Sequence, residues 1–172
     1  MNCKLCLQRP ADQKNSHIIS KFLLKGLFKN VQKRALAIHL NGNVRKVQNT
    51  PKEDHILCSS CERRIGILET YFAPIIEKIH NYSNYPSEYK YYKILASEFL
   101  VCTEIDSTLF KLFSYSLIWR ASITKVDYFE NFKLVPHIEE ELRVFLNTFL
   151  CDTAFKLDNF NSVITLDLML PS

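Results

Sequence analysis

Hydrophobic residues recur at the spacing of an α-helix in several stretches of this 172-residue chain. After Cys61 they follow one another at steps of three and four residues, which predicts an amphipathic helix with one buried face: Ile65, Leu68, Phe72, Ile75, Ile76 and Ile79. Pro74 lies inside this pattern. Because proline removes a backbone donor, we expect it to kink or divide the helix.

Residues that favour helix starts predict two more helices in the second half of the chain. Asp106 or Ser107 can cap the segment TLFKLFSYSLIWRAS by accepting from free backbone N–H groups. Pro136 suits the first turn of HIEEELRVFLNTFL, where its missing N–H has no cost and the glutamates complement the helix dipole.

Weaker signals of the same kind predict a helix over about residues 20–30, with Ser20 as its cap. They also predict a helix that starts at Ser87 or Glu88 and ends near Cys102.

Short apolar runs predict strands elsewhere. Residues 16–19 favour a brief strand, and the Asn-Gly pair at 41 and 42 favours a hairpin within RALAIHLNGNVRKVQN. The tail SVITLDLML is also typical of a strand. We therefore expect an α+β fold, with a small β-containing module at residues 1–70 and a mostly helical region at residues 71–172.

The composition narrows the class of protein. Nearly half of the residues are hydrophobic and only three are glycine, which excludes a disordered or fibrous chain. The apolar runs are short and interrupted by charges, well below the roughly 20 residues that cross a bilayer, so no membrane partner is expected. The N-terminus MNCKLCLQRP has no apolar signal region, and this favours a cytoplasmic location with reduced thiols.

Charge is distributed unevenly along the chain. Residues 1–65 hold thirteen basic and four acidic side chains, a net charge of +9, whereas residues 66–172 have a net charge of −5. This asymmetry suggests that the first part binds a polyanion, although short basic segments are also common as solvated surface.

Four of the six cysteines form two CxxC pairs, and this spacing predicts a metal site. Zn²⁺ prefers four soft ligands in a tetrahedron, and each CxxC turn supplies two sulfurs. A structural zinc bound by Cys3, Cys6, Cys58 and Cys61 would close a loop of 51 residues. The alternative is buried or redox-active thiols. Cys102 and Cys151 lie in apolar contexts and are expected to fill the core.

The order CKLC, SHIIS, a hairpin and HILCSSCE resembles the zinc-stapled type of HNH, or ββα-metal, endonuclease module over about residues 1–70. The later segments YSLIWRAS and EEELRVFL resemble those of an uncharacterised prokaryotic group of HNH type. That group suggests a role in phage defence or in a mobile element.

The resemblance implies metal-dependent hydrolysis of phosphodiester bonds. His17 would act as general base on the attacking water, and a divalent cation, Mg²⁺ or Mn²⁺, would neutralise charge on the leaving oxygen. The substrate would be nucleic acid, with DNA favoured over RNA. Its backbone would be bound by basic side chains: Lys21, Lys25, Arg45, Lys46, Arg63 and Arg64.

Two positions depart from the family pattern. Ser16 stands before His17 where the family often has an acidic residue or a second histidine, and Glu62 follows Cys61 where it has histidine. Glu62 is a candidate ligand for the catalytic cation, because carboxylates suit hard cations, and Glu69 would share its helix face. Asn49 is a weak counterpart of the central asparagine.

Each candidate residue also has an ordinary structural interpretation. A histidine in an apolar segment, such as His17, is often a core residue, and Glu62 could be a solvated helix residue. His55 could replace a metal ligand. The remaining histidines, His39, His80 and His137, are expected at the surface.

The pair Trp119-Arg120 is most simply a helix segment with a buried ring, and its arginine would pair with a carboxylate near Glu139 to Glu141.

Two other functions are compatible with these patterns. A zinc-ribbon module could bind nucleic acid without cutting it. The acidic helical region could instead contact a protein partner or a second copy of the chain. A CxxC redox enzyme is disfavoured, because the residues after Cys6 do not form a thioredoxin-like βαβ unit.

Overall fold

The computed structural model describes residues 1–28, 35–38, 42, 44–47, 49–79, 81–103 and 105–151. Within them the chain forms helices and small antiparallel sheets, which confirms the predicted α+β class. The predicted C-terminal strand, His39 and His80 lie outside the described residues.

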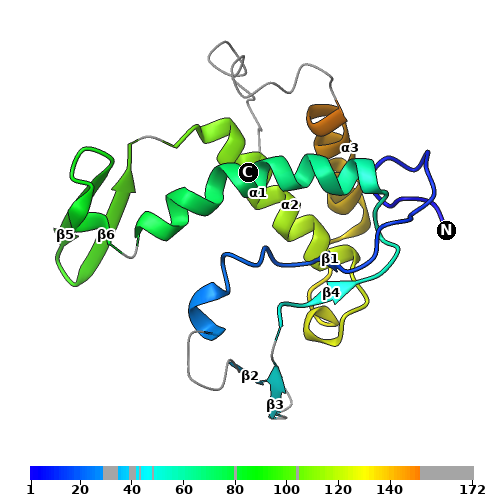
Figure 1. Cartoon of the computed structure of the whole chain (residues 1–172), viewed down its shortest axis with the longest axis horizontal. Helices are drawn as coiled ribbons and strands as arrows, with labels where there is room; N and C mark the ends of the chain where they lie inside the picture. Colours follow the sequence, from blue (N-terminus) through cyan, green and yellow to red (C-terminus); the bar gives the residue numbers. More distant parts are fainter. Residues whose placement is uncertain are drawn as a thin grey trace.

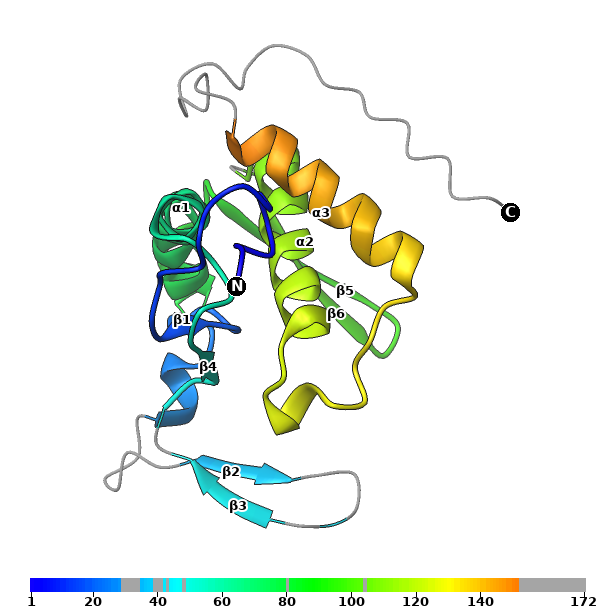
Figure 2. The ribbon, with the colours of Figure 1, turned by 90° about the vertical axis from the view of Figure 1, so that its right-hand side faces the viewer.

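Three α-helices make up the body of the described chain (Figures 1 and 2). They are α1 (Ser59–Ile79), α2 (Ser107–Ile123) and α3 (Pro136–Cys151), and each packs against the other two. All three were predicted from their spacing and starting residues. Of the two effects expected from Pro74, a kink or a division, the division does not occur, because α1 continues through Pro74.

Asp106 caps α2 as predicted. Its carboxylate accepts from the backbone N–H groups of Thr108 and Leu109, each at 2.9 Å. These are donors that a helix leaves without partners in its first turn, so the cap fixes where α2 begins.

Two short sheets lie in the N-terminal part of the chain. Strand β1 (Ser16–His17) pairs with β4 (Lys52–Glu53), and β2 (Ala35–Ile38) pairs with β3 (Val44–Val47). The β2–β3 hairpin was predicted, and Gly42 in its connection has a φ of +82°, which glycine adopts without strain. In Figure 2 this hairpin extends away from the helices.

The predicted helix at residues 20–30 was wrong over its described part. Residues 21–24 form turns, and only the 3₁₀ helix η1 (Lys25–Phe28) follows. The Ser20 hydroxyl does not cap a helix. It donates instead to Glu69 of α1 at 2.7 Å, so a tertiary contact takes the place of the local one.

The predicted helix ending near Cys102 was also wrong. This stretch forms a second hairpin, in which β5 (Tyr89–Ile94) pairs with β6 (Ser97–Cys102). The hairpin follows the 3₁₀ helix η2 (Tyr82–Asn84) and projects from the end of α1 (Figure 1). It is held at its base, where the Tyr89 hydroxyl donates to the Ile75 carbonyl at 2.7 Å.

One hydrophobic core joins residues from both parts of the chain. Ile18, Leu57, Leu68 and Phe72 are fully buried in the same cluster as residues of the later helices, among them Leu109, Leu112, Trp119, Leu146 and Leu150. The predicted module boundary at residue 70 falls inside α1. A third 3₁₀ helix, η3 (Asp127–Phe129), lies between α2 and α3.

Candidate functional site

The four cysteines of the two CxxC pairs lie together and are buried. Their sulfurs are all within 4.8 Å of one another, and those of Cys6 and Cys58 are 3.9 Å apart. Sulfurs on a tetrahedral zinc are about 3.8 Å apart, given a Zn–S distance of about 2.3 Å. The cluster therefore fits a structural metal such as zinc, held by Cys3, Cys6, Cys58 and Cys61.

Backbone contacts hold the two CxxC turns against each other. The N–H of Lys4 donates to the Ile56 carbonyl at 2.9 Å. The Asp12 carboxylate accepts from the Ser59 N–H at 2.7 Å and so caps α1 next to Cys58. This bond lowers the pKa of Asp12. The first turn is thus tied to the start of α1 by residues that do not themselves bind the metal.

Crowding changes the acidity of these thiols. The Cys3 sulfur accepts a hydrogen bond from Cys61, which lowers the pKa of Cys3 to about 4 and raises that of Cys61 well above its usual range. Burial also raises the pKa of Cys58, so without a metal the cluster favours a thiolate at Cys3 over one at Cys58 or Cys61.

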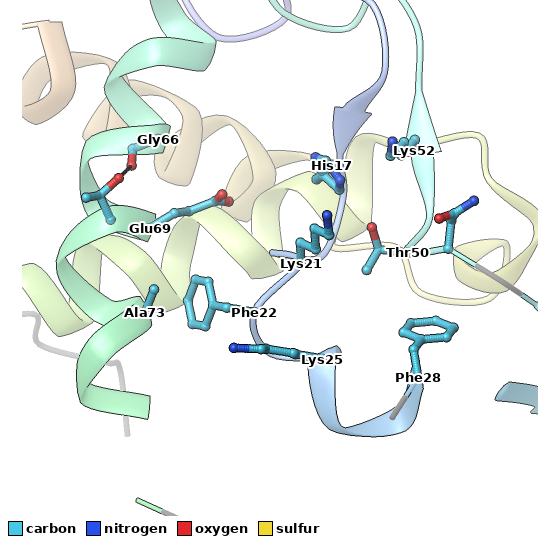
Figure 3. Close-up of a pocket in the computed structure, with 12 residues that line it drawn as sticks. His17, Lys21, Phe22, Lys25, Phe28, Thr50, Lys52, Gly66, Glu69 and Ala73 are labelled. Carbon is cyan, nitrogen blue, oxygen red and sulfur yellow. Dashed lines mark hydrogen bonds between the residues drawn. The ribbon is translucent and has the colours of Figure 1, made fainter. Parts of the chain in front are cut away.

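His17 lies on β1, whose pairing with β4 places it opposite Lys52. The next residue, Ile18, donates its N–H to the Pro51 carbonyl at 3.0 Å and is fully buried. The buried side chain of Ile18 thus anchors this strand in the hydrophobic core. The His17 side chain is half-buried and faces a cavity (Figure 3).

The cavity has a volume of about 820 Å³ and lies between β1, η1 and the middle of α1 (Figure 3). Three lysines line it together with His17. The remaining polar lining comes from the loop before β4 and from α1: Asn49, Thr50, Glu69 and Thr70. The cavity thus combines an imidazole, several cations and an apolar floor that includes Phe22 and Phe28.

The environment favours a neutral His17. Burial lowers the pKa of its imidazole, and the nearby positive charges of Lys52, Arg120 and Lys21 lower it further, while Glu69 opposes them. A neutral imidazole has a free lone pair and can accept a proton. The lowered pKa therefore favours the uncharged form of the His17 imidazole at neutral pH.

The structure brings some of the predicted basic residues to this cavity and leaves others outside it. Lys21 and Lys25 line it, and Lys25 also pairs with Glu77 at 2.8 Å. Arg63 and Arg64 belong to α1 but not to the cavity lining. Lys46 is exposed on β3, which also carries Arg45. Sequence reasoning missed Lys52, because its place beside His17 depends on the register of β1 with β4.

Glu62 does not line the cavity of His17. It is more than half buried, and burial raises the pKa of its carboxyl group, while the nearby Ser16 and Arg120 oppose this. The fully buried Ser16 Oγ lies beside this carboxyl group, close enough for its hydrogen-bonding to lower the Glu62 pKa. The Glu62 carboxylate is of the type that hard cations prefer, and Ser16 is its neighbour.

Arg120 differs from its predicted role. Trp119 is buried as expected, but the ion pair of Arg120 is with Glu69 of α1 at 2.9 Å, not with the acidic start of α3. Glu139 of α3 accepts a hydrogen bond from Ser122 instead. The guanidinium group of Arg120 is therefore directed toward β1 and α1.

The remaining histidines do not enter the metal cluster or this cavity within the described part of the chain. His55 Nδ1 lies 2.9 Å from the Ala11 carbonyl oxygen, and His137 is exposed, as predicted.

Comparisons with known proteins found no matching family model, no matching curated protein and no matching solved structure. Over the described residues, no helix has the length and hydrophobicity needed to cross a membrane.

Proposed function

We propose that this chain is a metal-dependent endonuclease of HNH type that hydrolyses nucleic-acid phosphodiester bonds, with DNA as the favoured substrate. The observation that carries the proposal is the position of His17, a neutral imidazole that faces a cavity lined by Lys21, Lys25 and Lys52. A base beside a cluster of cations suits attack on a phosphodiester, because the cations bind the anion and the base activates water.

In this proposal His17 takes a proton from the water that attacks phosphorus. Lys21 and Lys52 hold the phosphate backbone at the cavity and offset the charge that develops on its oxygens. Contacts of this kind bind the backbone without reading the bases, so affinity is expected to fall steeply with salt.

Glu62 is the candidate ligand for the catalytic cation, because carboxylates suit hard cations. A divalent ion such as Mg²⁺ or Mn²⁺ would supply positive charge to the departing oxygen. The cysteine cluster would hold zinc and have a structural role, because four thiolates leave no open position for substrate.

Plasmid nicking tests this function. We expect the purified protein to nick supercoiled DNA when Mg²⁺ or Mn²⁺ is added, and to do so at least about 100-fold more slowly when His17 is changed to alanine, because general bases contribute about 10²- to 10⁴-fold. His137→Ala is the matched control, since His137 is exposed on α3. Equal rates for the wild type and His17→Ala would contradict the proposal.

A second candidate is a module that binds nucleic acid without cutting it. The replacements at Ser16 and Glu62 favour it, because serine is a poor ligand and neither side chain lines the cavity of His17. This candidate predicts salt-sensitive DNA binding, measured by fluorescence anisotropy, with no nicking in any divalent ion. His17→Ala should then leave the affinity unchanged.

A further inference from the structure

Arg120 is a fully buried arginine that reaches out of α2 toward β1 and α1. Its side chain is 1% exposed. Its Nε donates to the Ser116 carbonyl one turn earlier at 3.2 Å, which fixes the side chain along its own helix. The two terminal nitrogens are thereby directed at groups that come from residues about 100 positions earlier in the chain.

One of these groups is the backbone carbonyl of His17. Arg120 Nη1 donates to this oxygen at 2.7 Å. On the other side, β1 is paired with β4, and the neighbouring Ile18 N–H bonds to the Pro51 carbonyl at 3.0 Å. The backbone of His17 is thus held between β4 and the guanidinium group of Arg120.

The same guanidinium group ties β1 to the middle of α1. Nη1 lies 2.9 Å from Glu69 Oε1, and Nη2 donates to Ser20 Oγ at 3.4 Å. The Ser20 hydroxyl in turn donates to the same Glu69 oxygen at 2.7 Å. Arg120, Glu69 and Ser20 therefore form a closed set of contacts that joins the strand of His17 to the cavity wall, with Arg120 and Ser20 buried and Glu69 partly exposed.

We infer that Arg120 is the positioning residue for His17, so that a side chain of the helical region sets the place of the catalytic base in the N-terminal part. This inference rests on the proposed function. A planar guanidinium group is needed, because it has five donors in a fixed fork, whereas a lysine ammonium cannot reach the carbonyl, the carboxylate and the hydroxyl in the same geometry.

Besides holding the backbone of His17, Arg120 favours the neutral form of its imidazole through its charge. Its positive charge is one of the causes that lower the pKa of His17, with burial the largest. Glu69, Lys52 and Lys21 also act on the imidazole, so Arg120 alone does not set its acidity.

Arg120→Lys tests the inference, with Arg143→Lys as matched control. Arg143 is also largely buried, donates to a backbone carbonyl, that of Leu5 at 2.8 Å, and pairs with Glu140. We expect Arg120→Lys to lower the nicking rate at saturating DNA by about 10- to 100-fold, the cost of a small misplacement. The DNA concentration for half-maximal rate should stay close to that of the wild type, because the cavity lysines remain.

Arg143→Lys should nick at the wild-type rate. Urea unfolding of both variants shows how far each loses stability. An equal loss of rate in both variants, or a wild-type rate in Arg120→Lys, would overturn the inference. If Arg120→Lys does not fold, Ser20→Ala replaces it, because this change removes one member of the set and is expected to lower the rate in the same way.

NMR signals of the His17 imidazole test the positioning role of Arg120 without depending on DNA cleavage. If the wild-type protein does not nick DNA, the proposed function fails, but the imidazole signals still report how His17 is held. We expect Arg120→Lys to shift the His17 Cε1–H resonance and its titration, whereas Arg143→Lys should leave both unchanged. An unchanged His17 signal in Arg120→Lys would refute the positioning role.

Discussion

At the scale of single residues, the protonation of His17 depends on its burial and on the charged side chains around it. The charges that act on His17 are mainly positive. The acidic residue among them, Glu69, forms an ion pair with Arg120 and accepts a hydrogen bond from Ser20. An imidazole in such surroundings stays neutral, which suits a base and not an acid. The His17 imidazole is therefore expected to be uncharged at neutral pH.

This charge state predicts the pH dependence of nicking. The pKa of His17 lies below 6.5, so the base form persists at neutral pH and activity should fall only as pH drops through that lowered pKa. Folding stability follows the same sign: the unfolded chain binds the proton more tightly, so the contribution of His17 is present above pH 6.5 and is lost as pH falls through the folded pKa.

Lys52→Gln should move the acid limb of the rate profile to higher pH, because removing a neighbouring cation raises the pKa of His17. Lys111→Gln, on an exposed position of α2, should leave the limb in place. Nicking rates measured between pH 5 and 8 decide this, and a limb that moves to lower pH in Lys52→Gln would contradict the assigned sign.

At the scale of elements, the sequence predicted those parts in which local signals and tertiary packing agree. The helices α1, α2 and α3 have clear starts, apolar faces or a cap, and the β2–β3 hairpin has Gly42 in its connection. The β5–β6 hairpin lacked such a signal. Its turn contains Leu95, which adopts a φ of +55° that glycine or asparagine usually supplies, so the reversal could not be seen.

The candidate site was predictable to a similar extent. The CxxC spacing is local and predicted the cysteine cluster, and the strand of His17 was predicted from the apolar residues Ile18 and Ile19 that follow it. The partner of Arg120 was not predictable, because Glu69 and the acidic start of α3 are equally good partners by charge. Helix α2 packs against both α1 and α3, so the partner is decided only by the side of α2 on which the folded chain places Arg120.

The link between the first CxxC turn and α1 predicts the effect of losing one thiolate. Cys58→Ser should abolish metal binding and lower the midpoint of thermal unfolding by more than about 10 °C, since each kcal/mol shifts it by about 2–4 °C and structural zinc contributes several kcal/mol. Metal analysis of the wild type should give one zinc per chain.

Cys102→Ser is the control for this change, because Cys102 lies in β6 outside the cluster. It should keep the metal and nearly all of the stability. Thermal unfolding followed by circular dichroism measures both variants, and an equally stable, metal-free Cys58→Ser protein would show that the cluster does not hold a structural metal.

At the scale of the whole molecule, the N-terminal part and the helical region share one core. Phe72 of α1 stacks on Phe113 of α2 with ring centroids 4.9 Å apart, and Phe113 also stacks on Phe22. Lys4, beside the first cysteine, donates to the carbonyl of Ile123 at the end of α2 at 2.7 Å. The two parts therefore stabilise each other.

A fragment of residues 1–79 should consequently fail to fold, even with zinc, because the apolar side of α1 would lose the side chains of α2 and α3 that cover it. We expect no cooperative thermal transition for the fragment, compared with a sharp one for the full chain. A fragment that unfolds cooperatively would show that the N-terminal part is an independent domain.

The β5–β6 hairpin stands apart from this shared core. It is anchored near its base by Tyr89 and by the ion pair of Lys78 with Glu88 at 2.7 Å, while Leu95 at its turn is 95% exposed. A two-stranded ribbon held in this way can separate without disturbing the helices. A protease that cuts the peptide after Leu95 would therefore leave a nicked protein whose metal cluster and cavity are intact.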